Sequence, residues 1–174
     1  MRIVRHARSG KDVVLELLGP GEVFGGVAVI ERCSYPVSAQ AVEATMVLKI
    51  PGEPMRGLSD RYPVVIREMA LMIGRRLRAA HDTVESLAVD PVEARLAQRL
   101  VRLADTVGVW RADGIELPFH LTRQGLADMS GTTVETTIRI VSRWLKEGLL
   151  RENASRLVVP DLPALRGLAE AGGE

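Results

Sequence analysis

Cysteine, aromatic residues and long apolar runs are scarce in this 174-residue chain, and each scarcity excludes a class of protein. The single cysteine, Cys33, excludes an internal disulfide framework and is typical of a reducing cytoplasm. Aromatic residues make up 3% of the chain, which leaves little for base stacking or an aromatic cage. The longest apolar runs, such as residues 13–18, are too short to cross a bilayer, and the N-terminus lacks the apolar core of a signal peptide. We therefore expect a cytoplasmic protein without a membrane partner.

A strong charge imbalance is also missing, since the formal net charge is +1. Residues 119–159 hold six basic and four acidic side chains, which is only a weak basic excess. Charge alone therefore does not indicate nucleic-acid binding. The chain also lacks a Ser/His/Asp or Cys/His arrangement, a phosphate-binding loop and a metal-ligand cluster. We predict no catalytic residue, no metal site and no enzymatic activity.

The first third of the chain has the pattern of short strands. Residues 13–18 precede the turn signal Gly19-Pro20-Gly21, and residues 23–30 and 37–50 are rich in Val, Ala and Ile. Residues 51–54 resemble a turn that closes this region. We predict a strand-rich domain over residues 1–62.

Residues 63–89 change to a helical period. Seven apolar residues recur with spacings of four and three, which predicts a coiled-coil seam between two copies of the chain: Ile66, Ala70, Ile73, Leu77, Ala80, Val84 and Leu87. A second stripe of Val65, Met69 and Met72 is expected to pack the helix on the strand-rich domain. The alternative is one helix buried within a monomer.

A third region begins at Asp90-Pro91, where Asp90 is expected to cap a helix whose first position is Pro91. Residues 92–103 then place Val and Leu on one face. We set a domain boundary here and assign residues 90–174 to a separate domain.

Residues 122–145 carry the strongest motif, a helix-turn-helix. Thr122 caps a short first helix, and Gly131 supplies the positive φ that a tight turn needs. Thr132 with Glu135 forms a capping-box pattern for the second helix, and Thr133 is the competing cap. The buried face of the second helix is expected to hold Ile140, Val141, Trp144 and Leu145.

The second helix carries side chains suited to the major groove of DNA. Glu135 and Arg139 are four residues apart and so share a face. A carboxylate accepts a hydrogen bond from cytosine N4, and a guanidinium binds guanine O6 and N7. Ile138 offers only apolar contact. The alternative interpretation of Glu135 and Arg139 is an ordinary surface ion pair.

A hairpin wing is predicted around residues 152–156, followed by a closing helix from Asp161 to Leu168. The wing and the two caps supply candidates for phosphate contacts, which position a protein on DNA without specifying sequence. These candidates are Thr122, Arg123, Thr133, Arg143 and Arg156.

With these motifs, the chain resembles the CRP/FNR family of bacterial transcription regulators. The resemblance rests on Gly19–Gly25, on residues 38–43, on Ile50-Pro51 and on residues 121–150. It implies an α+β fold with an N-terminal cyclic-nucleotide-binding-like β-roll, a long dimerisation helix over residues 63–89 and a C-terminal winged helix-turn-helix. Family members carry further strands before the position that Met1 matches, so we expect a partial roll. A truncated start and a reduced sensor both remain open.

The resemblance also bears on cofactors. Members that bind cyclic AMP hold the ribose with Glu and the cyclic phosphate with Arg, whereas this chain has Gly26 and Tyr35 at those positions. Members with an iron–sulfur cluster use four cysteines, and here Cys33 is alone. We therefore expect neither cofactor. A haem-dependent gas or redox sensor stays open as an alternative, with His6, His81 and Cys33 as candidate ligands.

Finally, the resemblance implies a partner and a target. In relatives, the residues that match Glu135 and Arg139 read a G·C pair in a TGA-containing half-site of a palindromic promoter. Val134 and Ile138 are further candidates for base contacts, and Val134 stands where the cyclic-AMP-responsive branch has Arg. We expect a homodimer on double-stranded DNA, with RNA polymerase as a partner if the protein is an activator. The runner-up is a ligand-binding module without DNA function.

Overall fold

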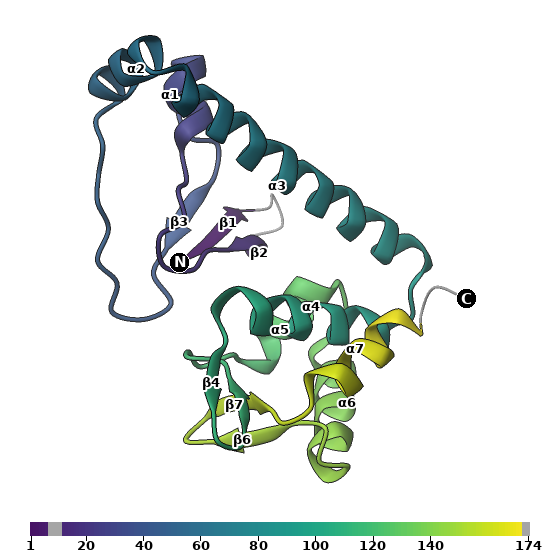
Figure 1. Ribbon diagram of the computed structural model, residues 1–174. Helices are drawn as coiled ribbons and strands as arrows, with labels where there is room; N and C mark the ends of the chain where they lie inside the picture. The colour runs from purple at the N-terminus through teal and green to yellow at the C-terminus, as the bar shows by residue number, and fades with distance from the viewer. Residues whose placement is uncertain (7–11, 172–174) are drawn as a thin grey trace.

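The computed structural model describes residues 1–6 and 12–171 of the chain, and it has two halves joined by one long helix (Figure 1). The N-terminal half consists of β1 (Arg2–His6), β2 (Asp12–Leu17), α1 (Gly26–Glu31), β3 (Ser38–Gln40) and α2 (Gly52–Arg61). The long helix is α3 (Pro63–Val89). The C-terminal half consists of α4 (Val92–Val107), β4 (Val109–Arg111), β5 (Gly114–Glu116), α5 (Arg123–Ser130), α6 (Val134–Lys146), β6 (Arg151–Asn153), β7 (Arg156–Val159) and α7 (Leu162–Glu170).

The N-terminal half is built on a small antiparallel sheet of order β2-β1-β3. Its central strand β1 buries Ile3 and Val4, and Leu18 closes the layer beneath them. The register between β1 and β2 shifts between Ile3 and Val4. This sheet, with α1 and α2, lies where the resemblance implied a partial roll.

Two helices of this half were not expected. Residues 23–30 were expected to form a strand, but residues 26–31 form α1, because Val29 packs against α2 at Gly52 rather than pairing with a strand. Residues 51–54 were expected to form only a turn, but Pro51 instead stands at the N-cap of α2. Proline is tolerated at the start of a helix because the first N–H groups of a helix have no internal partners, so the N–H that proline lacks is not missed.

The expected strand over residues 37–50 forms only at Ser38–Gln40, which pairs with β1. All of residues 41–50 are exposed and lack regular secondary structure. Met46 is 98% exposed and Leu48 is 88% exposed, so apolar side chains face solvent here. Among the described residues, no strand lies beside this segment to pair with its backbone.

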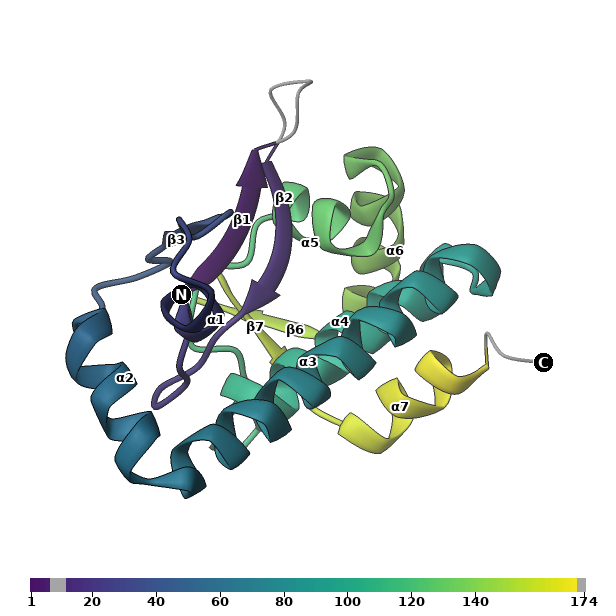
Figure 2. The same ribbon diagram turned by 90° about the horizontal axis from the view of Figure 1, so that it is seen from above.

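Helix α3 runs along both halves, as Figures 1 and 2 show. One of its two apolar stripes is packed against the N-terminal half and the other is exposed. Met69 is buried, and Val65 and Met72 are half-buried, so the second stripe packs on the roll as predicted. The seven seam residues are all exposed in the single chain: Ile66, Ala70, Ile73, Leu77, Ala80, Val84 and Leu87. The partly buried ion pair between Arg76 and Glu16, 2.9 Å apart, also ties α3 to β2.

The C-terminal half is a helical unit backed by an antiparallel sheet of order β4-β5-β7-β6. Its core is continuous and includes Leu96, Leu100, Leu126 and Trp144, all fully buried. The hairpin of β6 and β7 is the predicted wing, and the side chain of Asp161 caps α7 as expected. The β4–β5 hairpin was not predicted, because its strands have only three residues each.

At the junction between α3 and α4, helix α4 begins one residue later than expected. Asp90 does not cap α4 but ends α3, and Pro91 occupies the N-cap of α4. The Asp90 carboxylate instead accepts a hydrogen bond from Gln98 at 2.7 Å. The two halves also touch away from this junction, because β2 lies beside α5 in both views and Leu17 packs against the C-terminal core.

Candidate nucleic-acid interface

The helix-turn-helix is held by caps that the local sequence supplies. The hydroxyl of Thr122 accepts from the backbone N–H of Gly125 at 3.0 Å and starts α5. Gly131 ends α5 in the left-handed conformation, with φ of 59°. Of the two competing threonines, Thr133 is the cap of α6, and its hydroxyl accepts from the N–H of Thr136 at 3.2 Å. The capping-box expectation for Thr132 is therefore wrong, because helical geometry begins one residue later.

The inner face of α6 anchors it firmly. Ile140, Val141 and Trp144 are buried as predicted, and Leu145 is half-buried. The indole N–H of Trp144 donates to Glu93 of α4 at 3.0 Å. This packing fixes which residues of α6 face outward.

Glu135 and Arg139 both lie on the outward face of α6. Hydrogen bonds from its own backbone N–H and from the Thr133 hydroxyl lower the pKa of the Glu135 carboxyl, which keeps it an ionised acceptor. Within residues 1–6 and 12–171, no hydrogen bond or ion pair holds the Arg139 side chain, so the expected alternative of a surface ion pair with Glu135 does not form. Ile138 is 47% exposed on the same helix, whereas Val134 is half-buried. Two charged groups of opposite sign are thus exposed to solvent on the same helix.

The arginines expected to contact phosphates are engaged within the chain. Arg123 pairs with Glu152 and Arg156 with Glu116, each at 3.2 Å, and Arg143 pairs with Glu93. All three arginine side chains remain at least a quarter exposed. A phosphate contact by any of these arginines would require its ion pair with the carboxylate to break first.

Glu93 contacts α6, although the sequence pattern predicted it only as part of the first turn of the helix after Asp90. Burial raises the pKa of the Glu93 carboxyl, but hydrogen bonds from Arg143 and Trp144 outweigh burial and bring the pKa below its usual value. The positive charge of Arg139 acts in the same direction. Glu93 lies some fifty residues before its partners, so no local pattern links them.

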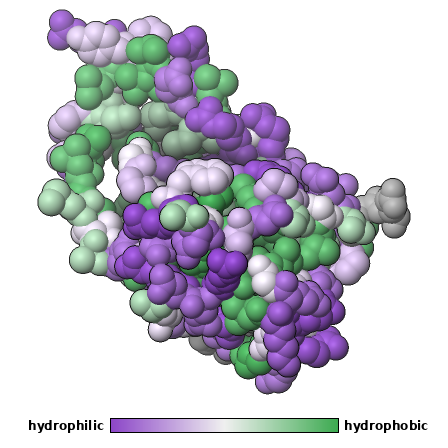
Figure 3. Space-filling model, turned by 60° about the horizontal axis from the view of Figure 1, so that its bottom comes forward, coloured by the Kyte–Doolittle hydropathy of each residue, from purple (hydrophilic) through white to green (hydrophobic). Residues whose placement is uncertain are grey.

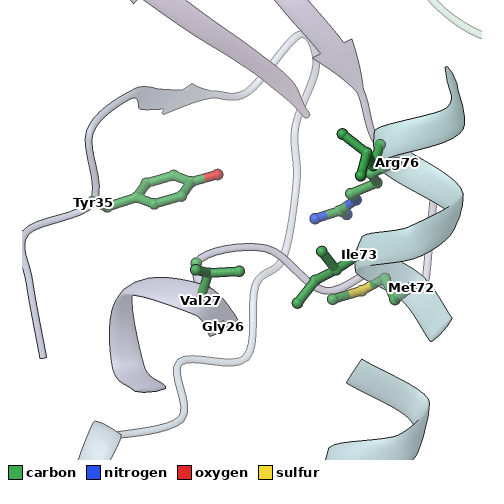
Figure 4. A pocket seen from close by; sticks show the side chains of 8 residues that line it. Gly26, Val27, Tyr35, Met72, Ile73 and Arg76 are labelled. Atoms are coloured by element: carbon green, nitrogen blue, oxygen red, sulfur yellow. The ribbon is translucent and has the colours of Figure 1, made fainter. Parts of the chain in front are cut away.

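A cavity of about 370 Å³ lies between the roll and α3 (Figure 4). Its lining is mostly apolar, with Gly26 and Val27 from α1 and Met72 and Ile73 from α3. Tyr35 and Arg76 point toward this space from opposite sides. Burial raises the pKa of the Tyr35 hydroxyl, so it stays neutral.

Arg76 is the one charged side chain among the described residues that line this cavity, and no sequence motif pointed to it. Its guanidinium is already bound by the Glu16 carboxylate at 2.9 Å and donates to the carbonyl of Val23 at 2.6 Å. Gly26 and Tyr35, which the resemblance implied to stand at the two ligand positions of the cyclic-AMP-binding members, both line this space. The described lining therefore offers no carboxylate.

The candidate haem ligands do not form a cluster. His6, His81 and Cys33 are all exposed, and His6 lies 3.2 Å from the hydroxyl of Ser38. The described part of the chain contains no group of three or more His, Cys, Asp or Glu residues that could hold a metal ion. No helix in that part has the length and apolarity of a membrane span.

Comparison with known proteins agrees with this architecture. Residues 1–62 match the model of the cyclic nucleotide-binding domain, and residues 94–168 match that of the Crp-like helix-turn-helix domain. The cyclic AMP receptor protein of Thermus thermophilus is 30% identical over 97% of this chain and 75% of its own length. The transcriptional activator protein anr of Pseudomonas aeruginosa is 26% identical over 95% of this chain and 67% of its own length. The crystal structure of a CRP/FNR family regulator from Thermus thermophilus has a TM-score of 0.78 at 24% identity, and covers 99% of this chain and 84% of that one.

A winged helix-turn-helix with an open recognition helix, joined by a long helix to a cyclic-nucleotide-binding type of roll, defines a DNA-binding transcription regulator. The chain belongs to the CRP/FNR family.

Proposed function

We propose that this protein binds, as a homodimer, a palindromic promoter site with TGA in each half, and that Glu135 and Arg139 read the bases. The observation that carries the proposal is the exposure of both side chains on the first turns of α6, with the Arg139 guanidinium unbound within the described residues. The N-terminal residues of a recognition helix are those that reach base edges in the major groove. Val134 and Ile138 add apolar contacts beside them.

The exposed seam of α3 supports the homodimer. Ile66, Ile73 and Leu77 are 43%, 37% and 54% exposed, although a free α3 surface could have carried polar residues at these positions. A partner α3 would remove this apolar strip from water. Such a dimer presents two recognition helices, as a palindrome with half-sites about 10 bp apart requires.

The arginine pairs support binding that depends strongly on salt. Arg123, Arg143 and Arg156 are partly exposed and each is paired with a carboxylate, and Thr122 and Thr133 lie at the two helix starts. On DNA the guanidinium groups exchange carboxylates for phosphates and release counterions.

We further propose that the effector is not cyclic AMP, although several relatives are named for that ligand. The cavity beside α3 has Gly26 and Tyr35 where a carboxylate and a guanidinium would be needed, and Arg76 is occupied by Glu16. A cyclic phosphate there would lose its strongest charge-assisted contacts.

The test is a gel shift on a duplex with two inverted TGA half-sites, compared over a salt series. We expect Arg139→Ala to weaken binding by about 1–3 kcal/mol and to relax specificity at one guanine. Arg123→Ala is the matched control, because loss of a phosphate contact should weaken binding to all sequences and reduce the salt slope by about 1. Unchanged affinity and specificity of Arg139→Ala in the gel shift would refute the role of Arg139. Absence of salt-dependent binding in the wild type would favour a ligand-binding module.

A further inference from the structure

Two arginines of α4 donate hydrogen bonds to the backbone carbonyl groups at the end of α5. Arg95 donates to the carbonyl of Ser130 at 2.9 Å and to that of Gly131 at 3.3 Å, and Arg99 donates to the carbonyl of Met129 at 2.9 Å. The last carbonyls of a helix lack internal partners and carry partial negative charge. The turn of the helix-turn-helix is thus fastened to α4 at three consecutive residues.

Arg99 also reaches the long helix. Its second guanidinium nitrogen donates to the hydroxyl of Thr83 at 3.1 Å, and that hydroxyl donates in turn to the carbonyl of Ala79 at 2.8 Å. One turn further along α3, Leu87 lies directly against Gly131: a Cβ on that glycine would be 2.6 Å from a methyl group of Leu87. Helix α3 is therefore connected to the turn in two ways, indirectly through Arg99 of α4 and directly through the apolar contact of Leu87 with Gly131.

The hydrogen bond between Arg99 and Thr83 matters for the charge of Arg99, because the acceptors of this side chain are neutral. In the part of the chain that the structure describes, no carboxylate pairs with Arg99, and its acceptors are a carbonyl and a hydroxyl. Burial, together with the positive charges of Arg102 and Arg95, lowers the pKa of Arg99. Arg99 is half-buried and is held by neutral oxygens, so the loss of one acceptor removes part of the hydrogen bonding that compensates its charge.

We propose that the Thr83–Arg99 hydrogen bond is a positioning link, which fixes the orientation of the helix-turn-helix relative to α3. In a dimer joined along α3, this orientation sets the separation and angle of the two recognition helices. The link therefore governs binding to two half-sites at once, and it does not alter how one recognition helix reads one half-site. This inference rests on the proposed function, because it needs a homodimer on a palindrome.

The test compares full-length Thr83→Val with Thr83→Ser on two probes. One probe is a duplex with two inverted TGA half-sites whose centres are about 10 bp apart, and the other keeps only one half-site. Valine preserves the shape of the side chain and removes the acceptor, whereas serine keeps it. We expect Thr83→Val to bind the full site about tenfold more weakly, with half-site affinity unchanged and Thr83→Ser equal to wild type. Thr106→Val, at an exposed threonine of α4, is the control for the same substitution outside the link.

The outcomes separate the two proposals. A wild type that binds both probes equally contradicts the homodimer on a palindrome. In that case, hydrogen exchange of the amides of residues 126–131 tests the link alone, and we expect faster exchange in Thr83→Val only. A wild type that prefers the full site, with Thr83→Val keeping the same preference, overturns the link. Equal weakening of both probes by Thr83→Val also overturns it, since this would indicate a general loss of structure.

Discussion

The two halves of this molecule use their apolar residues in opposite ways. In the C-terminal half, the large apolar side chains enter one core, and among the described residues after 90 only Trp110 and Ile138 are large apolar residues left exposed. In the described residues before 90, the buried apolar side chains are Ile3, Val4, Leu18 and Met69. The exposed apolar residues lie mainly along residues 41–50 and along α3. Figure 3 shows hydrophobic surface, coloured green, exposed to solvent in the upper part of the view.

The difference teaches that the C-terminal half is stabilised by its own core, whereas the N-terminal half and α3 leave much of their apolar surface exposed. Large apolar patches on a soluble protein mark interaction sites. Substitutions in the core, along the seam and at the contact between the halves should therefore have different consequences.

The largest effect is expected from the core of the C-terminal half. Trp144→Ala removes a fully buried indole and its hydrogen bond to Glu93, so the free energy of unfolding should fall by about 3–5 kcal/mol. Trp110→Ala is the matched control, since Trp110 is 77% exposed and its loss should change stability by no more than about 0.5 kcal/mol. Chemical denaturation measures both variants. Equal losses would mean that the C-terminal core is not organised around Trp144.

An intermediate effect is expected at the seam. Leu77→Ala should weaken dimerisation by about 2–3 kcal/mol, because each partner loses an apolar side chain that only association buries. Leu71→Ala is the control: Leu71 is similarly exposed on α3, at 49% against 54%, but lies off the seam. Sedimentation over a concentration series measures the dimerisation constant. If Leu71→Ala weakens the dimer as much as Leu77→Ala, the seam is assigned to the wrong face.

The smallest effect is expected where the halves meet. Gly131→Ala should destabilise the protein by about 1–2 kcal/mol through its left-handed backbone, with a further loss from contact with Leu87. Gly148→Ala is the control that measures the backbone effect alone. Gly148 also has a positive φ, of 78°, but a Cβ added there would meet no neighbouring atom within 4 Å. Thermal unfolding should rank Gly131→Ala below Gly148→Ala. Identical melting temperatures would show that Leu87 does not press on the turn.

Much of the candidate site could be predicted because its signals are local. Thr122 and Gly131 begin and end α5 as expected, and the buried face of α6 follows from spacing alone. The same is true of α3, whose period of three and four places the seam and the second stripe on different faces. Residues 23–54 were harder to predict, because Val-rich and Pro-containing segments suit strands, turns and short helices alike.

The sequence by itself determined the helix-turn-helix, the long helix and the outward position of Glu135 and Arg139, because caps and periodicity act over a few residues. Only the tertiary structure decided that Glu93 supports α6, that Arg123, Arg143 and Arg156 are held by carboxylates, and that Arg99 joins α3 to the turn. These contacts link residues between 16 and 51 positions apart. Their partners are chosen by how the helices pack, and no local pattern encodes that choice.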